Sequence, residues 1–162
     1  MILVLQSDHI DVMRQQAVRT YPEECCGLLL GTQDGEGKRR CVQEILPMEN
    51  TWTVETQALT ERDVSSATLN KQNRYWIDPR ALMEAQRYGR DRGWIILGIY
   101  HSHPDHLAVP SERDRQLAWA DYSYPILSVM DGQVADIQSW RLAEDHQFYG
   151  EAITSDENFE VP

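Results

Sequence analysis

Two short apolar runs, Cys25–Gly31 and Trp94–Tyr100, constrain the fold of this chain most, because each fits a strand buried within a sheet. A helical pattern precedes the first run: Ile10, Met13 and Ala17 are spaced three and four residues apart, as one buried helix face requires. A second helical segment precedes the other run. These patterns predict a sheet whose strands are separated by helices.

Caps and turns place the remaining elements. Asp78-Pro79 suits the start of a helix, and Asp131-Gly132 is typical of a hairpin turn. The expected strands are residues 1–6, 25–31, 40–46, 94–100, 126–130 and 134–142, and the expected helices are residues 7–20, 79–90 and 111–122. Residues 47–74 are polar and predict a long loop with some strand. The element order predicts an α/β (α+β) fold, in which helices flank a mixed central sheet.

The chain has 162 residues, enough for one domain with a hydrophobic core. We expect residues 1–142 to form that single domain and residues 143–162 to form an acidic, partly disordered tail. The net charge of −11 argues against nucleic acid and anionic membranes as partners, because both attract clustered cations. No apolar run approaches the roughly 20 residues of a membrane-spanning helix. An odd, small number of cysteines and no signal pattern favour a reducing cytoplasm.

The stretch His101-Ser102-His103-Pro104 carries the clearest chemical signal. Side chains alternate along a strand, so His101 and His103 point the same way, at the end where Pro104 stops the strand. The following loop returns at a helix start that carries Asp114. Three protein ligands with an open fourth position describe a catalytic zinc site. The ligand types suit Zn²⁺, although Mn²⁺, Fe²⁺ and Co²⁺ accept the same ligands.

Each part of this pattern also has an ordinary explanation. Ser111 and Asp114 resemble a capping box, in which the serine caps the helix and the acid reaches back to it. Capping and chemistry are compatible for Ser111, because its hydroxyl can accept one hydrogen bond and donate another. His106 lies in the connecting loop and is a candidate fourth ligand, although a surface or substrate-adjacent position is favoured for it.

The combined spacing resembles the signature of the JAMM (MPN+; Mov34/MPN/PAD-1) zinc metalloproteases at every defined position. The signature is His101-Ser102-His103, seven residues, Ser111, two residues and Asp114. The segment from Tyr21 to Gly31 resembles the family's upstream glutamate region. Its pattern selects Glu24, but the adjacent Glu23 remains an alternative by spacing alone. The resemblance covers roughly residues 1–142 and is to the compact bacterial type, which implies a cytidine-deaminase-like JAMM/MPN fold.

The resemblance also implies a function. His101, His103 and Asp114 would hold Zn²⁺, Glu24 would be the general base, and the Ser111 hydroxyl would stabilise the oxyanion. The reaction would be hydrolysis of an amide or isopeptide bond at the C-terminus of a small ubiquitin-like, sulfur-carrier protein that ends in Gly-Gly. Residues 47–74 would shape a groove for that tail. Trp52 and Trp76 could wall it, but packing inside the protein is the favoured role for each.

Two rival hypotheses stand beside this one. The chain could be a noncatalytic MPN-type interaction scaffold, although the intact signature counts against that. It could also be a cysteine hydrolase that uses Cys25 or Cys26 with a histidine. The signature already employs the best-placed histidines, and the two cysteines fit buried small apolar residues better.

Overall fold

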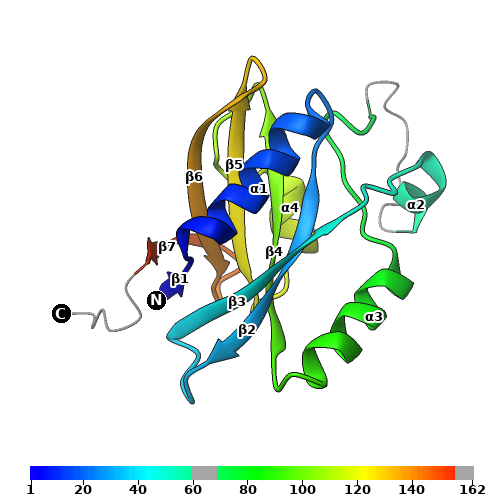
Figure 1. The fold of residues 1–162 in the computed structure, drawn as a ribbon. Coiled ribbons are helices and arrows are strands. Elements are labelled where there is room, and N and C mark those ends of the chain that lie inside the picture. Colours follow the sequence, from blue (N-terminus) through cyan, green and yellow to red (C-terminus); the bar gives the residue numbers. More distant parts are fainter. Residues whose placement is uncertain (60–68, 156–162) are drawn as a thin grey trace.

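The computed structural model describes residues 1–59 and 69–155, and in this part of the chain seven strands close into one barrel-like sheet (Figure 1). The spatial order of the strands is β1-β3-β2-β4-β5-β6-β7. The strands are β1 (Ile2–Val4), β2 (Cys26–Gln33), β3 (Arg39–Met48), β4 (Ile95–Pro104), β5 (Ser123–Met130), β6 (Gln133–Leu142) and β7 (Phe148–Thr154). The helices are α1 (Ser7–Thr20), α2 (Val54–Ala58), α3 (Pro79–Arg90) and α4 (Glu112–Leu117).

The sheet is mixed, as the element order predicts. Strand β1 runs parallel to β3 and β7, and β4 runs parallel to β5. The pairs β2–β3, β2–β4, β5–β6 and β6–β7 are antiparallel. The strand next to β4 on one side is therefore β2, and on the other side it is β5.

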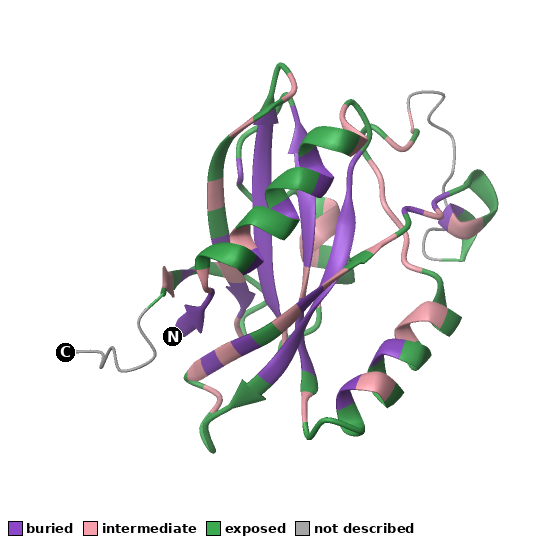
Figure 2. Cartoon of the chain, viewed as in Figure 1, coloured by how far each residue is buried: buried purple, intermediate pink, exposed green. Residues whose placement is uncertain are grey.

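Helices cover both faces of β2, which explains why its sequence is continuously apolar. Leu29 packs into the cluster that contains Met13 and Ala17 of α1. Its neighbours Leu28 and Leu30 point the other way, into the cluster that contains residues of α3. Figure 2 shows the buried strands between helices whose outer faces are exposed. The predicted core strand is thus confirmed.

Three elements differ from the sequence-based predictions. Helix α4 ends at Leu117 and does not continue to residue 122, because the Tyr124 hydroxyl accepts the Trp119 N–H at 2.7 Å. A continuing helix would need that N–H for the Arg115 carbonyl. The expected loop at 47–74 contains the short helix α2, whose N-cap is Thr53. Residues 60–68 of that segment lie outside the described part of the chain.

The third difference is strand β7, which lies within the expected acidic tail. It pairs with β1 and β6 and so closes the barrel. Its inward-facing residue is Glu151, a buried carboxylate that accepts a hydrogen bond from Ser139 Oγ at 2.8 Å. A charged residue at a buried strand position hides the alternating pattern from sequence reading. The sheet therefore extends beyond residue 142, and residues 156–162 lie outside the described part.

Among the described residues, no helix is long and apolar enough to cross a membrane.

Close backbone contact joins β4 to β5 at Gly98, whose strand partner is Ser123. A β-carbon placed on Gly98 would lie 2.0 Å from the Ser123 carbonyl oxygen and 2.8 Å from its carbonyl carbon. Backbone atoms of a paired strand cannot move away as a side chain can. A glycine is therefore needed where β4 begins its approach to the histidines.

We predict that Gly98→Ala lowers the free energy of unfolding by about 1–3 kcal/mol, because it forces β4 away from β5. Gly150→Ala in β7 is the matched control, since a β-carbon there meets no atom within 4 Å. Urea denaturation of both variants tests this. Equal stability of the two variants would contradict the inferred close contact.

Candidate metal centre

The two histidines lie side by side on β4, deep in the sheet. His101 is opposite Cys26 of β2 and Ile126 of β5, and His103 is opposite Ser128 of β5. Both side chains are buried, with relative exposures of 1% for His101 and 8% for His103. The intervening residue, Ser102, points to the other face, as strand alternation requires. The predicted common orientation of the two imidazoles is confirmed.

Asp114 reaches the histidines from the first turn of α4. Ser111 is the N-cap of that helix, and its Oγ accepts the Asp114 N–H at 3.1 Å. In return, Asp114 Oδ2 accepts hydrogen bonds from the Ser111 N–H and the Ser111 hydroxyl, both at 2.6 Å. The capping box that the sequence suggests is therefore present. It fixes the carboxylate without using all of its oxygen lone pairs.

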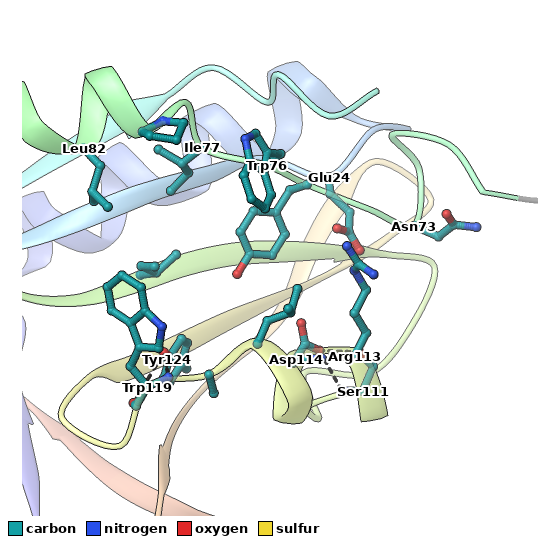
Figure 3. Close-up of a pocket in the computed structure, with 15 residues that line it drawn as sticks. Glu24, Asn73, Trp76, Ile77, Leu82, Ser111, Arg113, Asp114, Trp119 and Tyr124 are labelled. Carbon is teal, nitrogen blue, oxygen red and sulfur yellow. Dashed lines mark hydrogen bonds between the residues drawn. The ribbon is translucent and has the colours of Figure 1, made fainter. Parts of the chain in front are cut away.

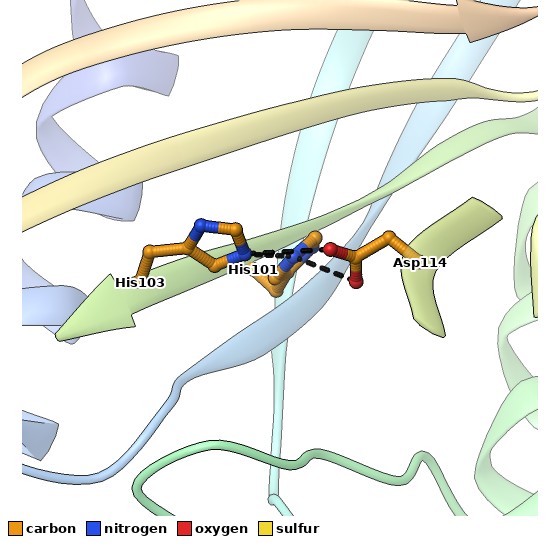
Figure 4. Close-up of side chains that lie close together, drawn as sticks. All are labelled: His101, His103 and Asp114. Carbon is orange, nitrogen blue, oxygen red and sulfur yellow. Dashed lines mark hydrogen bonds and ion pairs between the residues drawn. The ribbon is translucent and has the colours of Figure 1, made fainter. Parts of the chain in front are cut away.

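Three potential ligand atoms converge on one point (Figure 4). The Nε2 atoms of His101 and His103 are 3.0 Å apart. Asp114 Oδ1 lies 3.2 Å from His101 Nε2, and Asp114 Oδ2 lies 3.5 Å from His103 Nε2. Among the described residues, His101, His103 and Asp114 are the group whose ligand atoms all lie within 4.8 Å of one another.

The hydrogen bonding of His103 shows that a cation suits this point. His103 Nδ1 lies 2.9 Å from the Leu107 carbonyl oxygen. A carbonyl oxygen can only accept, so Nδ1 carries the proton and a neutral ring has a bare lone pair on Nε2. That lone pair faces the Nε2 of His101 and a carboxylate. Nitrogen and oxygen donors that converge in this way fit Zn²⁺, and the Leu107 contact is the outer hydrogen bond that a metal-ligating histidine makes.

Electrostatics favour a neutral imidazole at His101 and an ionised carboxylate at Asp114. Burial lowers the pKa of His101 below its ordinary value, against the attraction of Asp114. Burial alone would raise the pKa of Asp114. The charge of His101, whenever that ring is protonated, and hydrogen bonds from His101, His103 and Ser111 nonetheless hold that pKa well below the ordinary range. An imidazole that avoids charge and a carboxylate that keeps it are the ligand forms that bind a divalent metal.

Glu24 is buried beside this cluster, whereas Glu23 is exposed. Glu24 precedes β2, and it lines the same pocket as Ser111 and Asp114. Its pKa is raised well above the ordinary value, mainly by burial and then by the charge of Asp114. Glu23 lines a different pocket, together with Gln16 and Arg19 of α1. The structure therefore places Glu24, of the two acids, within the pocket of the candidate centre.

Two hydrogen-bonding residues that sequence reasoning missed hold the Glu24 segment in place. The Ser102 hydroxyl accepts the Cys25 N–H at 2.8 Å, which ties the residue after Glu24 to β4. The Asn50 amide donates to the Glu24 carbonyl at 3.0 Å and to the Arg74 carbonyl at 2.9 Å. Asn50 is buried, and its side-chain oxygen also accepts hydrogen bonds from the backbone N–H groups of Trp52 and Trp76.

A pocket of about 350 Å³ opens beside the candidate centre (Figure 3). One end is polar and holds Glu24, Asn73 and Arg113. The other end is apolar and holds, among others, Leu82 and Trp119. Asp114 lies between the two ends, and Ser111 lies below Arg113 at the polar end. The pocket is therefore elongated and differs in polarity along its length.

The remaining sequence candidates lie elsewhere or have other contacts. His106 is exposed and is not part of the metal-ligand group found in the described residues. Trp52 is buried and donates its indole N–H to Gln57, whereas Trp76 lines the pocket. Cys25 and Cys26 are buried free thiols. Burial raises the pKa of Cys25 to about 11 and raises that of Cys26 as well, which disfavours a reactive thiolate.

Residues 6–143 match the sequence family described as prokaryotic homologs of the JAB domain (Prok-JAB). The chain belongs to this family. The match confirms the JAMM/MPN resemblance and the fold that it implies. It spans both histidines, Ser111, Asp114 and Glu24.

Named relatives of the chain are peptidases. The "CysO-cysteine peptidase" of Mycobacterium tuberculosis is 28% identical over 144 residues, which are 88% of this chain and 84% of the relative. A "probable TtuB-protein conjugate cleaving protease" of Thermus thermophilus is 30% identical over 120 residues, 74% of this chain and 66% of the relative. The solution structure of protein DSY2949 from Desulfitobacterium hafniense superimposes with a TM-score of 0.73 at 28% identity. It covers 99% of this chain and 96% of that protein. These names indicate peptidase activity in the Prok-JAB family.

We predict that Asn50→Asp destabilises the protein by about 2–3 kcal/mol, because it replaces two buried donors with an oxygen that faces carbonyl oxygens. Thermal unfolding measures the loss. Asn70→Asp is the control, since the Asn70 side chain acts on its neighbour Gln72 as an acceptor, which a carboxylate also provides. A wild-type melting temperature for Asn50→Asp would contradict the role given to Asn50.

Proposed function

We propose that this Prok-JAB protein is a zinc-dependent peptidase or isopeptidase. It would hydrolyse an amide bond at the C-terminus of a small ubiquitin-like, sulfur-carrier protein that ends in Gly-Gly. The observation that carries the proposal is the convergence of His101, His103 and Asp114 beside Glu24 and Ser111 in one pocket. An open fourth position at such a three-ligand site is the arrangement of catalytic zinc.

A zinc ion held by His101, His103 and Asp114 would supply Lewis-acid chemistry, polarising the amide carbonyl and lowering the pKa of a water molecule to about 7. The chain's own residues do the rest. Glu24 takes the proton of the attacking water and passes it to the leaving amine. The Ser111 hydroxyl donates to the oxyanion that forms on the carbonyl. For this it turns away from Asp114, while its oxygen still caps α4.

The substrate class is supported by the relatives and by the shape of the pocket. The relatives' names mention a CysO-cysteine substrate and TtuB–protein conjugates. An elongated pocket suits an extended tail such as one that ends in Gly-Gly, which has no side chains to obstruct its entry. We also propose a cytoplasmic location, because an odd, small number of cysteines is typical of a reducing compartment.

A scaffold without catalysis is the rival that an experiment must exclude. Buried convergent donors favour the enzyme, since a scaffold has no use for a buried imidazole lone pair that faces a second imidazole and a carboxylate. The cysteine hydrolase is disfavoured by the buried thiols. Cleavage of a carrier protein extended beyond its Gly-Gly end would separate enzyme from scaffold.

We predict that Glu24→Ala abolishes cleavage of such a carrier while zinc remains bound, because Glu24 is a base and not a ligand. Asp114→Ala and His103→Ala should lose zinc. Metal content measured by mass spectrometry, together with cleavage of the carrier, tests both parts.

Glu23→Ala and His106→Ala are the matched controls, because both residues are exposed and lie outside the ligand group. Both variants should keep zinc and activity. An active Glu24→Ala beside an inactive Glu23→Ala would overturn the assignment of the base. Absence of cleavage by fully zinc-loaded wild-type protein would favour the scaffold.

A further inference from the structure

An arginine occupies the polar end of the pocket. Arg113 follows the helix cap by two residues and lines the pocket together with Glu24 and Asn73. Figure 3 shows its side chain extending from α4 to the Glu24 carboxylate. The protein as a whole carries a net charge of −11. The positive charge of Arg113 in this pocket therefore differs in sign from the net charge of the chain.

A second arginine adds positive charge at the same end. Arg74 follows Asn73, and its guanidinium donates to the Asn73 carbonyl at 2.6 Å. Burial is the main cause of the raised pKa of Glu24, with the charge of Asp114 second. The positive charges of Arg74 and Arg113 lower the pKa of Glu24 and so oppose these two effects. Two guanidinium groups therefore act electrostatically on the space around Glu24.

The direction of the substrate in the pocket follows from the proposed function, on which this inference rests. Glu24 passes a proton to the leaving amine, so the leaving group must lie at the Glu24 end. The acyl chain then extends toward the apolar end, near Leu82 and Trp119. The first groups beyond the scissile nitrogen therefore come to lie beside Arg113.

We propose that Arg113 binds the α-carboxylate of the leaving residue, so that the preferred substrate carries a single C-terminal amino acid after the scissile bond. The α-carboxylate is separated from the scissile nitrogen by one carbon atom, so it reaches the groups adjacent to Glu24. A guanidinium matches a carboxylate in shape and charge and can bind it through two parallel hydrogen bonds. A lysine side chain in an isopeptide bond has no negative charge at that position.

The reaction balances as a hydrolysis without any co-reactant beyond water. The water oxygen bonds to the carbonyl carbon, and the bond between that carbon and the nitrogen breaks. The carrier leaves with a new C-terminal carboxylate. The leaving nitrogen takes the proton from Glu24, and the second product is a free amino acid. The class of reaction that supplies this substrate must therefore attach one amino acid, through its amine, to the C-terminus of the carrier.

The test compares two forms of one probe: a ubiquitin-like carrier that ends in Gly-Gly followed by one alanine, either as the free acid or as the C-terminal amide. Zinc-loaded wild-type protein should cleave the free acid with a kcat/KM roughly 10-fold or more above that of the amide. Arg113→Gln should lower cleavage of the free acid more than cleavage of the amide, so that the ratio falls to about 1. Arg113→Lys should restore part of the preference, because it keeps the charge without the planar fork.

Arg115→Gln is the matched control, since Arg115 lies on the same helix but pairs with Glu112 outside the pocket. It should keep the preference of the wild type. A second measurement does not depend on turnover. Titration of zinc-loaded Glu24→Gln protein with both probes should show tighter binding of the free acid, and this difference should disappear in the double variant with Arg113→Gln.

The outcomes separate this inference from the proposed function. Equal cleavage of the two probes by the wild type would overturn the carboxylate site while the peptidase stands. An Arg113→Gln variant that slows both probes equally would also overturn it, because Arg113 would then act through Glu24 and not on the leaving group. Cleavage of neither probe would overturn the inference together with the peptidase.

Discussion

Two imidazole nitrogens that face each other at 3.0 Å are the constraint on which the rest of this structure depends. The Leu107 carbonyl holds the proton of His103 on the far side of its ring, so the near nitrogen is a lone pair. Buried nitrogen and oxygen donors that converge in this way suit a divalent cation. Asp114 adds a negative charge at the same point, as a site for a divalent metal requires.

The sheet and the loops around it hold that arrangement in register. Gly98 lets β4 approach β5 closely, and Ser102, between the two histidines, ties β4 to the backbone beside Glu24. Asn50 joins the Glu24 segment to the segment that lines the pocket. Candidate base and candidate ligands thus come from three separate parts of the chain, the residue before β2, strand β4 and helix α4, but share one hydrogen-bonded framework. Activity and stability are expected to be linked at Ser102 and Asn50.

The sequence was sufficient for the buried strands and for the shared face of His101 and His103, because both follow from alternation along a strand. It was not sufficient to predict the structural role of Asn50. The hydrogen-bond partners of Asn50 are backbone groups far away in the chain, and no sequence motif indicates such contacts. The sequence did not predict strand β7, because the residue that this strand buries is the charged Glu151. Its carboxylate accepts a hydrogen bond from Ser139 of the neighbouring strand. Choosing Glu24 over Glu23 by pattern agrees with their burial, which only the folded chain displays.

The central claim is that His101, His103 and Asp114 together bind one zinc ion. The most direct test is X-ray diffraction from crystals of the zinc-loaded protein, with data collected on both sides of the zinc absorption edge. The account predicts one strong anomalous peak at about 2.0–2.2 Å from the two Nε2 atoms and an Asp114 oxygen. A fully loaded crystal with its anomalous peak elsewhere, or with none between these three side chains, would contradict it.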